Sequence, residues 1–295
     1  MLSSPKYYFD ELDKPIATLK SHEEMVVEVY DTYTNQITSE KILRPDIDYR
    51  KLTPITGPFY FEEAWPGNVL KVEIVDIEID ENGVMPLMPG MGLLGDKVNE
   101  ISTRIFHLNN QFIPFTDKMN LPVRPMIGTI GIAPKGDRVR AYTPGDFGGN
   151  LDFNGIGIGS VIYFPVFVPG ALLYLGDLHA LQGDGELNGT GMEVSGKVKL
   201  RVSTSQVKGL VRPVVRSRGV TSFISSHRSI EKAIEIAVED SINWLMNSFT
   251  LSRVDAYRLI SLAGNIRICQ IVNPRVTVRV DIEDSVINLE SFFTK

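Results

Sequence analysis

The sequence predicts an all-β body that extends through about residue 205, followed by a smaller α+β part. Before residue 205, apolar and polar residues alternate with a period of two in several segments, which is typical of strands with one buried face. After residue 211, apolar residues recur at helical spacing instead. With 295 residues, the chain can form one large β domain or two to three packed subdomains.

The N-terminal third contains two strand patterns. Residues 25–32, M-V-V-E-V-Y-D-T, are rich in β-branched side chains. Residues 69–79 alternate apolar and charged side chains, and the alternation changes parity after Val75-Asp76, which indicates a β-bulge. We expect residues 85–95, M-P-L-M-P-G-M-G-L-L-G, to form a loop, because proline and glycine interrupt every regular pattern there.

The middle of the chain contains an apolar, uncharged run, residues 161–175, which lies within the longest segment without charged side chains. It is shorter than the roughly 20 residues that a helix needs to span a bilayer, and Pro165 and Pro169 interrupt it. We therefore expect buried β structure. Residues 196–203 alternate cationic and apolar side chains, which predicts a half-exposed antiparallel strand.

Two helices and a strand are expected after residue 211. Residues 229–249 place apolar side chains at helical spacing, with Ser229 as the N-cap. A second helix begins at Ser252, which resembles a capping box together with Asp255. Residues 275–282 alternate again and predict a strand.

Composition excludes several classes of protein. The net charge of -6 argues against nucleic acid or an anionic membrane as the main partner. A single cysteine, Cys269, excludes an intramolecular disulfide and favours a reducing compartment. Residues 1–11 lack the basic start and apolar core of a signal peptide. We expect a soluble cytoplasmic protein.

One stretch has the composition of an active site. Residues 176–193 read G-D-L-H-A-L-Q-G-D-G-E-L-N-G-T-G-M-E and directly follow the uncharged run. Short oxygen acceptors combined with one imidazole suit a hard or borderline cation, and glycines let backbone approach a ligand closely. The pattern predicts a metal-assisted active site.

Spacing indicates which side chains meet. On a strand, Asp177 and His179 point to one face because they are two residues apart, and a return strand through residues 191–193 brings Glu193 beside them. The alternative is a glycine-rich hairpin with solvated acids and a core histidine.

The other histidines stand isolated among polar or loop residues (His22, His107 and His227). We therefore expect one histidine plus oxygen donors as the ligand set. This set fits Zn²⁺, and Mn²⁺ or Ca²⁺ less well.

Further candidates follow neighbouring glycines. Asn150 and Asp152 can reach a ligand beside exposed backbone, or they form an Asx-type turn. Glu186 is the candidate general base, because a carboxylate beside a cation can take a proton from bound water and return it to a leaving group. Its alternative is a solvated turn acid. Cys269 lies in an apolar stretch and is expected in the core.

Several motifs together resemble the acetamidase/formamidase family. They occur in a consistent order along nearly the whole chain. Besides residues 176–193, the motifs are T-G-P-F-Y-F-E-E-A-W-P-G-N (56–68), P-M-I-G-T-I-G-I-A-P (125–134), G-G-N-L-D (148–152) and A-G-N-I-R-I-C-Q-I-V-N-P (263–274).

The resemblance implies a mainly β fold with sandwich-like and barrel-like parts and a smaller α+β C-terminal portion. We divide it into residues 1–95, a sandwich-like part, residues 96–210, which carry the active-site motifs, and residues 211–295. The resemblance also implies hydrolysis of small linear amides to carboxylate and ammonia, a metal with zinc as the expected ion, and a homodimer or higher homo-oligomer.

Site residues follow from the resemblance by position. Asp177 and His179 would bind the metal, with Asn150 as a further ligand. Glu186 would be the general base, and Glu193 either a ligand or a catalytic acid behind the ligands. The residues expected to contact substrate are Asp152, Gln182 and Asp184.

Two positions depart from the family pattern. Phe147 stands where formamidase-type members often have histidine, and Asn68 stands where aspartate is usual. A lactam or another amide is therefore an alternative substrate. A non-catalytic, metal-stabilised β protein that binds a small molecule is the alternative function. A metal oxygenase fits less well, because its facial triad normally has two histidines.

Overall fold

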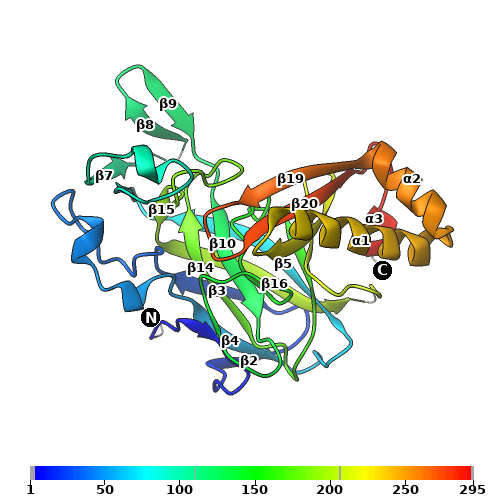
Figure 1. Ribbon diagram of the computed structural model, residues 1–295. Helices are drawn as coiled ribbons and strands as arrows, with labels where there is room; N and C mark the ends of the chain where they lie inside the picture. Colours follow the sequence, from blue (N-terminus) through cyan, green and yellow to red (C-terminus); the bar gives the residue numbers. More distant parts are fainter. Residues whose placement is uncertain (1–3, 110, 206, 294–295) are drawn as a thin grey trace.

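The computed structural model describes residues 4–109, 111–205 and 207–293, which are built around two eight-stranded sheets (Figure 1). The predicted fold class, a mainly β protein with a smaller α+β C-terminal portion, is confirmed. In the described part of the chain, no helix is long and apolar enough to cross a membrane.

The first sheet has strand β14 at its centre, and all seven residues of this strand are buried. Strands β10 and β15 flank β14, and β4 pairs with its first half. The path runs β12-β10-β14-β15-β6-β7, with β2 beside β4. The strands are β2 (Ala17–Leu19), β4 (Thr56–Phe61), β6 (Asn82–Leu87), β7 (Ser102–His107), β10 (Met126–Ile132), β12 (Gly148–Asn150), β14 (Leu173–His179) and β15 (Glu193–Val194).

The second sheet runs β19-β20-β18-β17-β13-β5-β16-β3. Lys199 pairs with Asp76 and Leu200 with Ile74, so Val75 is skipped and the predicted bulge is confirmed. The strands are β3 (Glu24–Val29), β5 (Val69–Ile79), β13 (Val161–Pro165), β16 (Gly196–Ser205), β17 (Val214–Ser217), β18 (Val220–His227), β19 (Gly264–Gln270) and β20 (Val276–Glu283).

One apolar core joins the two sheets. Ile130 and Leu178 from the first sheet and Val72 and Leu200 from the second belong to the same buried cluster. The uncharged run 161–175 supplies β13 and the start of β14, as predicted. This shared core makes both sheets the rigid support for side chains at the end of β14.

The helices gather at one end of the molecule (Figure 1). They are α1 (Ile230–Phe249), α2 (Arg253–Ala263) and α3 (Glu290–Phe293). Ser229 Oγ accepts from Lys232 N at the start of α1, and Ser252 Oγ accepts from Asp255 N at the start of α2, so both predicted N-caps are confirmed. Helix α1 packs on β18 and β20.

Smaller elements complete the fold. Strand β1 (Tyr8–Phe9) pairs with β11 (Val139–Arg140). Strands β8 (Phe112–Thr116) and β9 (Met119–Pro122) form a hairpin that projects from the body (Figure 1). The short 3₁₀ helices are Arg44–Asp46, Tyr49–Lys51 and Gly95–Lys97.

The structure corrects one predicted loop. Residues 85–87 of the expected loop 85–95 belong to β6, where Met85 pairs with Arg104 and Pro86 with Thr103. Strand β15 pairs with β6 only at Val84. Pro86 therefore lies at an edge position, where the missing N–H donor is tolerated.

The second sheet joins strands from all three parts of the predicted division. Strand β5 comes from residues 1–95, β13 and β16 come from residues 96–210, and β17 to β20 come from residues 211–295. The division at residues 95 and 210 stays a prediction.

Candidate metal centre

The end of β14 places two predicted ligands side by side. His179 Nε2 lies 3.3 Å from Asp177 Oδ1, as the two-residue spacing predicts. Asp177 has a φ of 62°, in the left-handed region that non-glycine residues rarely adopt. Such strain persists where the surrounding structure determines it, and here β10 and β15 hold β14 from both sides.

Strand β15 brings the third predicted residue to the same point. His179 pairs with Glu193 across the two strands, and Glu193 Oε1 lies 3.1 Å from His179 Nε2. Both side chains are almost completely buried. The predicted return strand therefore brings Glu193 to the imidazole.

Gln182 fixes the orientation of the imidazole. Its Nε2 donates to the carbonyl oxygen of Asp152 at 2.7 Å, so its Oε1 faces His179 Nδ1, also at 2.7 Å. His179 Nδ1 must therefore be the protonated nitrogen that donates, and Nε2 is directed at the carboxylates. Both ends of the Gln182 amide are thus engaged within the protein, and its expected contact with substrate stays a prediction.

Asn150 reaches the same region from β12. Thr129 Oγ1 lies 3.0 Å from Asp177 Oδ2 and is also within hydrogen-bond distance of Asn150 Oδ1. A hydroxyl has a single proton and can donate to only one of these oxygens. With the Asn150 amide turned, Nδ2 donates to Thr129 and Oδ1 is free to bind a ligand, which satisfies all three side chains.

Asp152 approaches Asp177 across a glycine. A Cβ atom added to Gly128 would lie 2.6 Å from Asp152 Oδ1 and 2.9 Å from Asp177 Oδ2. Only glycine at this position lets both carboxylates occupy the site. Asp152 Oδ2 accepts from Asn273 Nδ2 at 2.7 Å, whereas its Oδ1 points into the site.

Glu186 comes from the loop between β14 and β15. Its side chain is buried, and its φ of 49° is left-handed. One ligand atom each of Asp152, His179 and Glu186 lie within 4.8 Å of one another, and the same holds for Asp177, His179 and Glu193. Glu186 is therefore not the solvated turn acid of the alternative interpretation.

Asp184 lies outside this cluster. Its carboxylate forms a two-pronged ion pair with Arg279 of β20, at 3.0 and 2.8 Å. Next to it, Gly185 N donates to Cys269 O at 2.9 Å, which joins the loop to β19. The substrate contact expected of Asp184 stays a prediction; in the structure its side chain anchors the loop that bears Glu186.

Four buried polar atoms at the site lack hydrogen-bond partners among the residues that the structure describes. They are Asp152 Oδ1, Asp177 Oδ1, His179 Nε2 and Glu193 Oε2. Buried polar atoms are normally paired, because an unpaired one costs free energy. One imidazole nitrogen and several carboxylate oxygens are donors that suit a divalent cation. The residues therefore fit a metal ion.

The charges point to the same conclusion. Burial, together with the charge of Asp177, raises the pKa of Asp152 to about 7, and burial raises the pKa of Glu193 to about 7. Burial also raises the pKa of Glu186 well above its usual range. Burial is the largest influence on Asp177 and opposes its ionisation, but the His179 charge and hydrogen bonds from His179 and Thr129 together outweigh it and lower the pKa of Asp177. Without a cation, Asp152, Glu186 and Glu193 therefore keep their protons to a higher pH than usual, whereas Asp177 ionises readily.

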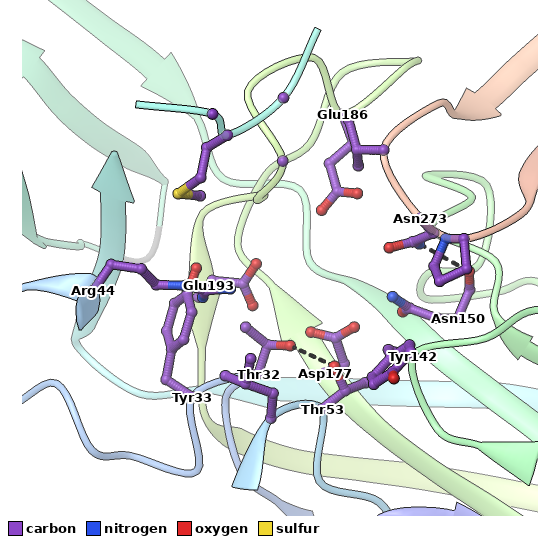
Figure 2. Close-up of a pocket in the computed structure, with 17 residues that line it drawn as sticks. Thr32, Tyr33, Arg44, Thr53, Tyr142, Asn150, Asp177, Glu186, Glu193 and Asn273 are labelled. Carbon is purple, nitrogen blue, oxygen red and sulfur yellow. Dashed lines mark hydrogen bonds between the residues drawn. The ribbon is translucent and has the colours of Figure 1, made fainter. Parts of the chain in front are cut away.

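The site opens into a cavity of about 320 Å³. Figure 2 shows Asp177, Glu186, Glu193 and Asn150 converging on its centre from different segments. This volume suits a small molecule rather than a polymer.

Sequence reasoning missed residues that complete the site. Tyr33 Oη lies 2.9 Å from Thr190 Oγ1, which donates to Glu193 Oε1 at 2.6 Å. Asn273, from the turn between β19 and β20, holds Asp152. Tyr33 has no sequence signal as a site residue, and Asn273 had one only as part of the family-like motif 263–274.

The two departures from the family pattern lie outside the cluster. Phe147 is buried, with its ring centroid 5.0 Å from that of Phe9. Asn68 Oδ1 accepts from Trp65 N in an exposed turn. Cys269 is buried in the core, as predicted.

Solved structures of other proteins share this fold. A predicted acetamidase/formamidase from Thermoanaerobacter tengcongensis is 41% identical, with a TM-score of 0.93 over 98% of this chain and 95% of that one. An acetamidase from Bacillus halodurans is 37% identical, with a TM-score of 0.93 over 95% of each chain.

Curated relatives carry related names. A formamidase from Methylophilus methylotrophus is 27% identical over 70% of this chain, and the match spans 63% of that protein, less than two thirds of its length. The residue pattern of the Acetamidase/Formamidase family matches residues 10–141 and 136–287. The chain belongs to the acetamidase/formamidase family.

Proposed function

We propose that the protein hydrolyses small linear amides to a carboxylate and ammonia with the help of one divalent cation, for which zinc is the expected ion. The observation that carries the proposal is the set of four unpartnered buried atoms on Asp152, Asp177, His179 and Glu193, which belong to two clusters that share His179. Membership of a family whose curated relatives are named formamidase and acetamidase supports the choice of substrate.

Asp177, His179 and Glu193 would hold the cation, with Asn150 Oδ1 as a further donor. A divalent cation bound there supplies an acidified water and polarises the amide carbonyl. Gln182 keeps His179 Nε2 directed at the site by accepting from Nδ1. Such hydrogen bonds behind a ligand set both its orientation and its basicity.

Glu186 would move the proton. Its carboxylate is buried, and repulsion from Asp152 adds to burial in raising its pKa. A carboxyl group with a raised pKa can accept a proton from the attacking water and then donate it to the departing nitrogen. Asp152, held by Asn273, would share this proton and orient the amide.

A non-catalytic protein that binds a small molecule remains the alternative function, since a metal-stabilised cavity can also hold a ligand without cleaving it. Release of ammonia distinguishes the two. The residues that would bind metal are the same in both cases, so metal content alone does not decide.

The test measures ammonia release from formamide, acetamide, propanamide and a small lactam. The protein is assayed as purified, after chelation, and after refilling with zinc. We expect activity that disappears on chelation and returns with zinc. If none of these amides releases ammonia although zinc is bound stoichiometrically, the non-catalytic binding protein is favoured.

Glu186→Gln isolates the proton-transfer role. We expect bound zinc to be retained and kcat to fall by about 100-fold or more, the order of general acid–base contributions. Glu62→Gln, on the exposed surface, is the matched control. Near-full activity of Glu186→Gln would remove Glu186 from this role.

Two further expectations belong to this proposal. We propose a homodimer or higher homo-oligomer in the cytoplasm, as the family resemblance and the single cysteine suggest. Light scattering of the purified protein measures the oligomeric state, and a monomer would contradict it.

A further inference from the structure

The cavity contains one cationic side chain that the proposed chemistry does not use. Among the described residues that line it, Arg44 is the only lysine or arginine. The other charged residues lining the cavity are Asp177, Glu186 and Glu193. The cavity thus has an acidic side and a basic residue within the same small volume.

Two aromatic rings hold the Arg44 guanidinium in place. Its Cζ atom lies 4.9 Å from the ring centroid of Tyr33 and 5.3 Å from that of Tyr49. Figure 2 shows the side chain extending towards Tyr33 at the cavity wall. Stacking on aromatic rings fixes the plane of a guanidinium and leaves its N–H edges free to donate.

No acceptor for these N–H groups is seen among the residues that the structure describes. Within residues 4–109, 111–205 and 207–293, no hydrogen bond or ion pair joins the Arg44 guanidinium to another side chain. By contrast, Arg279 binds Asp184, and Arg253 binds Glu239 through both of its terminal nitrogens. A pre-oriented arginine without a carboxylate partner is suited to bind an anion.

Arg44 is also near the reaction centre. The ring that it stacks on belongs to Tyr33, whose hydroxyl contacts Thr190, and Thr190 donates to Glu193. One tyrosine ring and one threonine hydroxyl therefore separate the guanidinium from a proposed metal ligand. A molecule with only a few bonds between its two ends can contact both.

We propose that Arg44 binds a carboxylate on the substrate, so that the preferred substrates are monoamides of short dicarboxylic acids. This rests on the proposed amide hydrolysis. Because ammonia is the proposed leaving group, the acyl chain is the part of the substrate that can carry the anion. The amide lies at the acidic side of the cavity, and the carboxylate lies at Arg44.

The test compares kcat/KM for succinamate and for butanamide, which has the same chain length without the charge. We expect a preference for succinamate of about 10- to 100-fold, the order for a charged hydrogen-bonded pair. Arg44→Met should abolish this preference and Arg44→Lys should keep part of it. The ratio cancels any general loss of activity.

Arg138→Met is the matched control. Arg138 also stacks on a tyrosine, 4.5 Å from the Tyr8 ring centroid, but it does not line the cavity. This variant should keep the wild-type ratio. The inference is overturned if the wild type hydrolyses butanamide as well as succinamate, or if Arg44→Met leaves the ratio of the two kcat/KM values unchanged. Neither result would contradict amide hydrolysis.

A binding measurement separates this inference from the proposed reaction. If the zinc-loaded protein releases no ammonia from any amide, the proposed function fails, and titration calorimetry with succinate and butanoate decides about Arg44. Tighter binding of succinate that Arg44→Met removes supports an anion site. Equal affinities for the two acids would overturn it.

Discussion

Gly128 determines how closely two acids of the site can approach. A methyl group there would meet Asp152 Oδ1 and Asp177 Oδ2 well inside van der Waals contact. Its backbone angles are ordinary, so the requirement for glycine comes from space and not from conformation. The residue therefore acts on the ligand geometry without contributing a side chain.

We predict that Gly128→Ala loses zinc and activity while it still folds. The added methyl group must displace at least one carboxylate, and a displacement of about 1 Å can reduce turnover by about 100-fold. Metal content, kcat and the circular dichroism spectrum measure this. Gly183→Ala is the control, because a Cβ atom there meets nothing within 4 Å. Full zinc occupancy in Gly128→Ala would contradict the geometry.

The raised pKa of Asp152 makes the stability of the metal-free protein depend on pH. Burial and the charge of Asp177 raise this pKa from 3.8 to about 7, so between these values the folded metal-free protein binds more protons than the unfolded chain. The contribution of Asp152 to the stability of the folded protein is greatest below pH 3.8 and is lost as the pH rises through about 7. The loss from Asp152 is at most about 4 kcal/mol, from roughly 1.4 kcal/mol per pKa unit.

Thermal unfolding of the metal-free protein at pH 5 and pH 8 tests this. Asp152→Asn removes the titrating group, so we expect the variant to lose less stability than the wild type between the two pH values. Zinc should reverse the trend, because it binds the deprotonated carboxylates and its affinity rises with pH. An equal loss in both proteins would show that Asp152 ionises normally.

At the scale of elements, the turn between β19 and β20 and the loop that bears Glu186 form one unit. Asp184 binds Arg279, and Gly185 pairs with residues of the β19 end through its backbone. The C-terminal hairpin thus positions the proposed proton carrier, although it belongs to a part of the chain that the sequence analysis assigned to a separate portion.

We expect Asp184→Asn to lower kcat more than it raises KM, by about tenfold or more, because the loop is positioned less accurately. Glu239→Gln breaks a similar two-pronged pair, with Arg253, between helices α1 and α2. It should leave kcat unchanged. Equal effects of the two variants would mean that the Arg279 pair only stabilises the fold.

Helix α1 offers a prediction for stability alone. Ser229 Oγ accepts from Lys232 N, and replacing such a cap by alanine costs about 1 kcal/mol of unfolding free energy. Ser229→Ala should therefore lower the unfolding free energy without changing kcat or zinc content. Denaturant unfolding measures the unfolding free energy, and ammonia release measures kcat. A change in kcat would link α1 to the site.

At the scale of the whole molecule, two sheets share one core, and the site lies where their strands and loops meet. We therefore expect one cooperative unfolding transition that zinc shifts upward. Free zinc at 100 times its dissociation constant should add about 2.7 kcal/mol. Calorimetry with and without chelator measures this. Two separate transitions would contradict a single cooperative unit.

The sequence predicted what local spacing determines. The alternation at 69–79, the caps at Ser229 and Ser252, and the meeting of Asp177 with His179 depend on neighbours within a few positions. Tyr33 and Asn273 could not be found that way, since they reach the site through contacts with residues more than 100 positions away. Pro86 wrongly indicated a loop, because an edge strand tolerates the missing backbone N–H of proline, whereas a central strand does not.

The contact of Asn273 with Asp152 also has a consequence for the growing chain on the ribosome. These residues are 121 positions apart, which corresponds to roughly 6 to 24 seconds of synthesis at about 5–20 residues per second. During that interval, the nascent protein contains Asp152 but lacks the asparagine that holds it. We therefore expect the proposed metal centre to be completed late, and a truncated product that ends before β19 to lack the asparagine that holds Asp152.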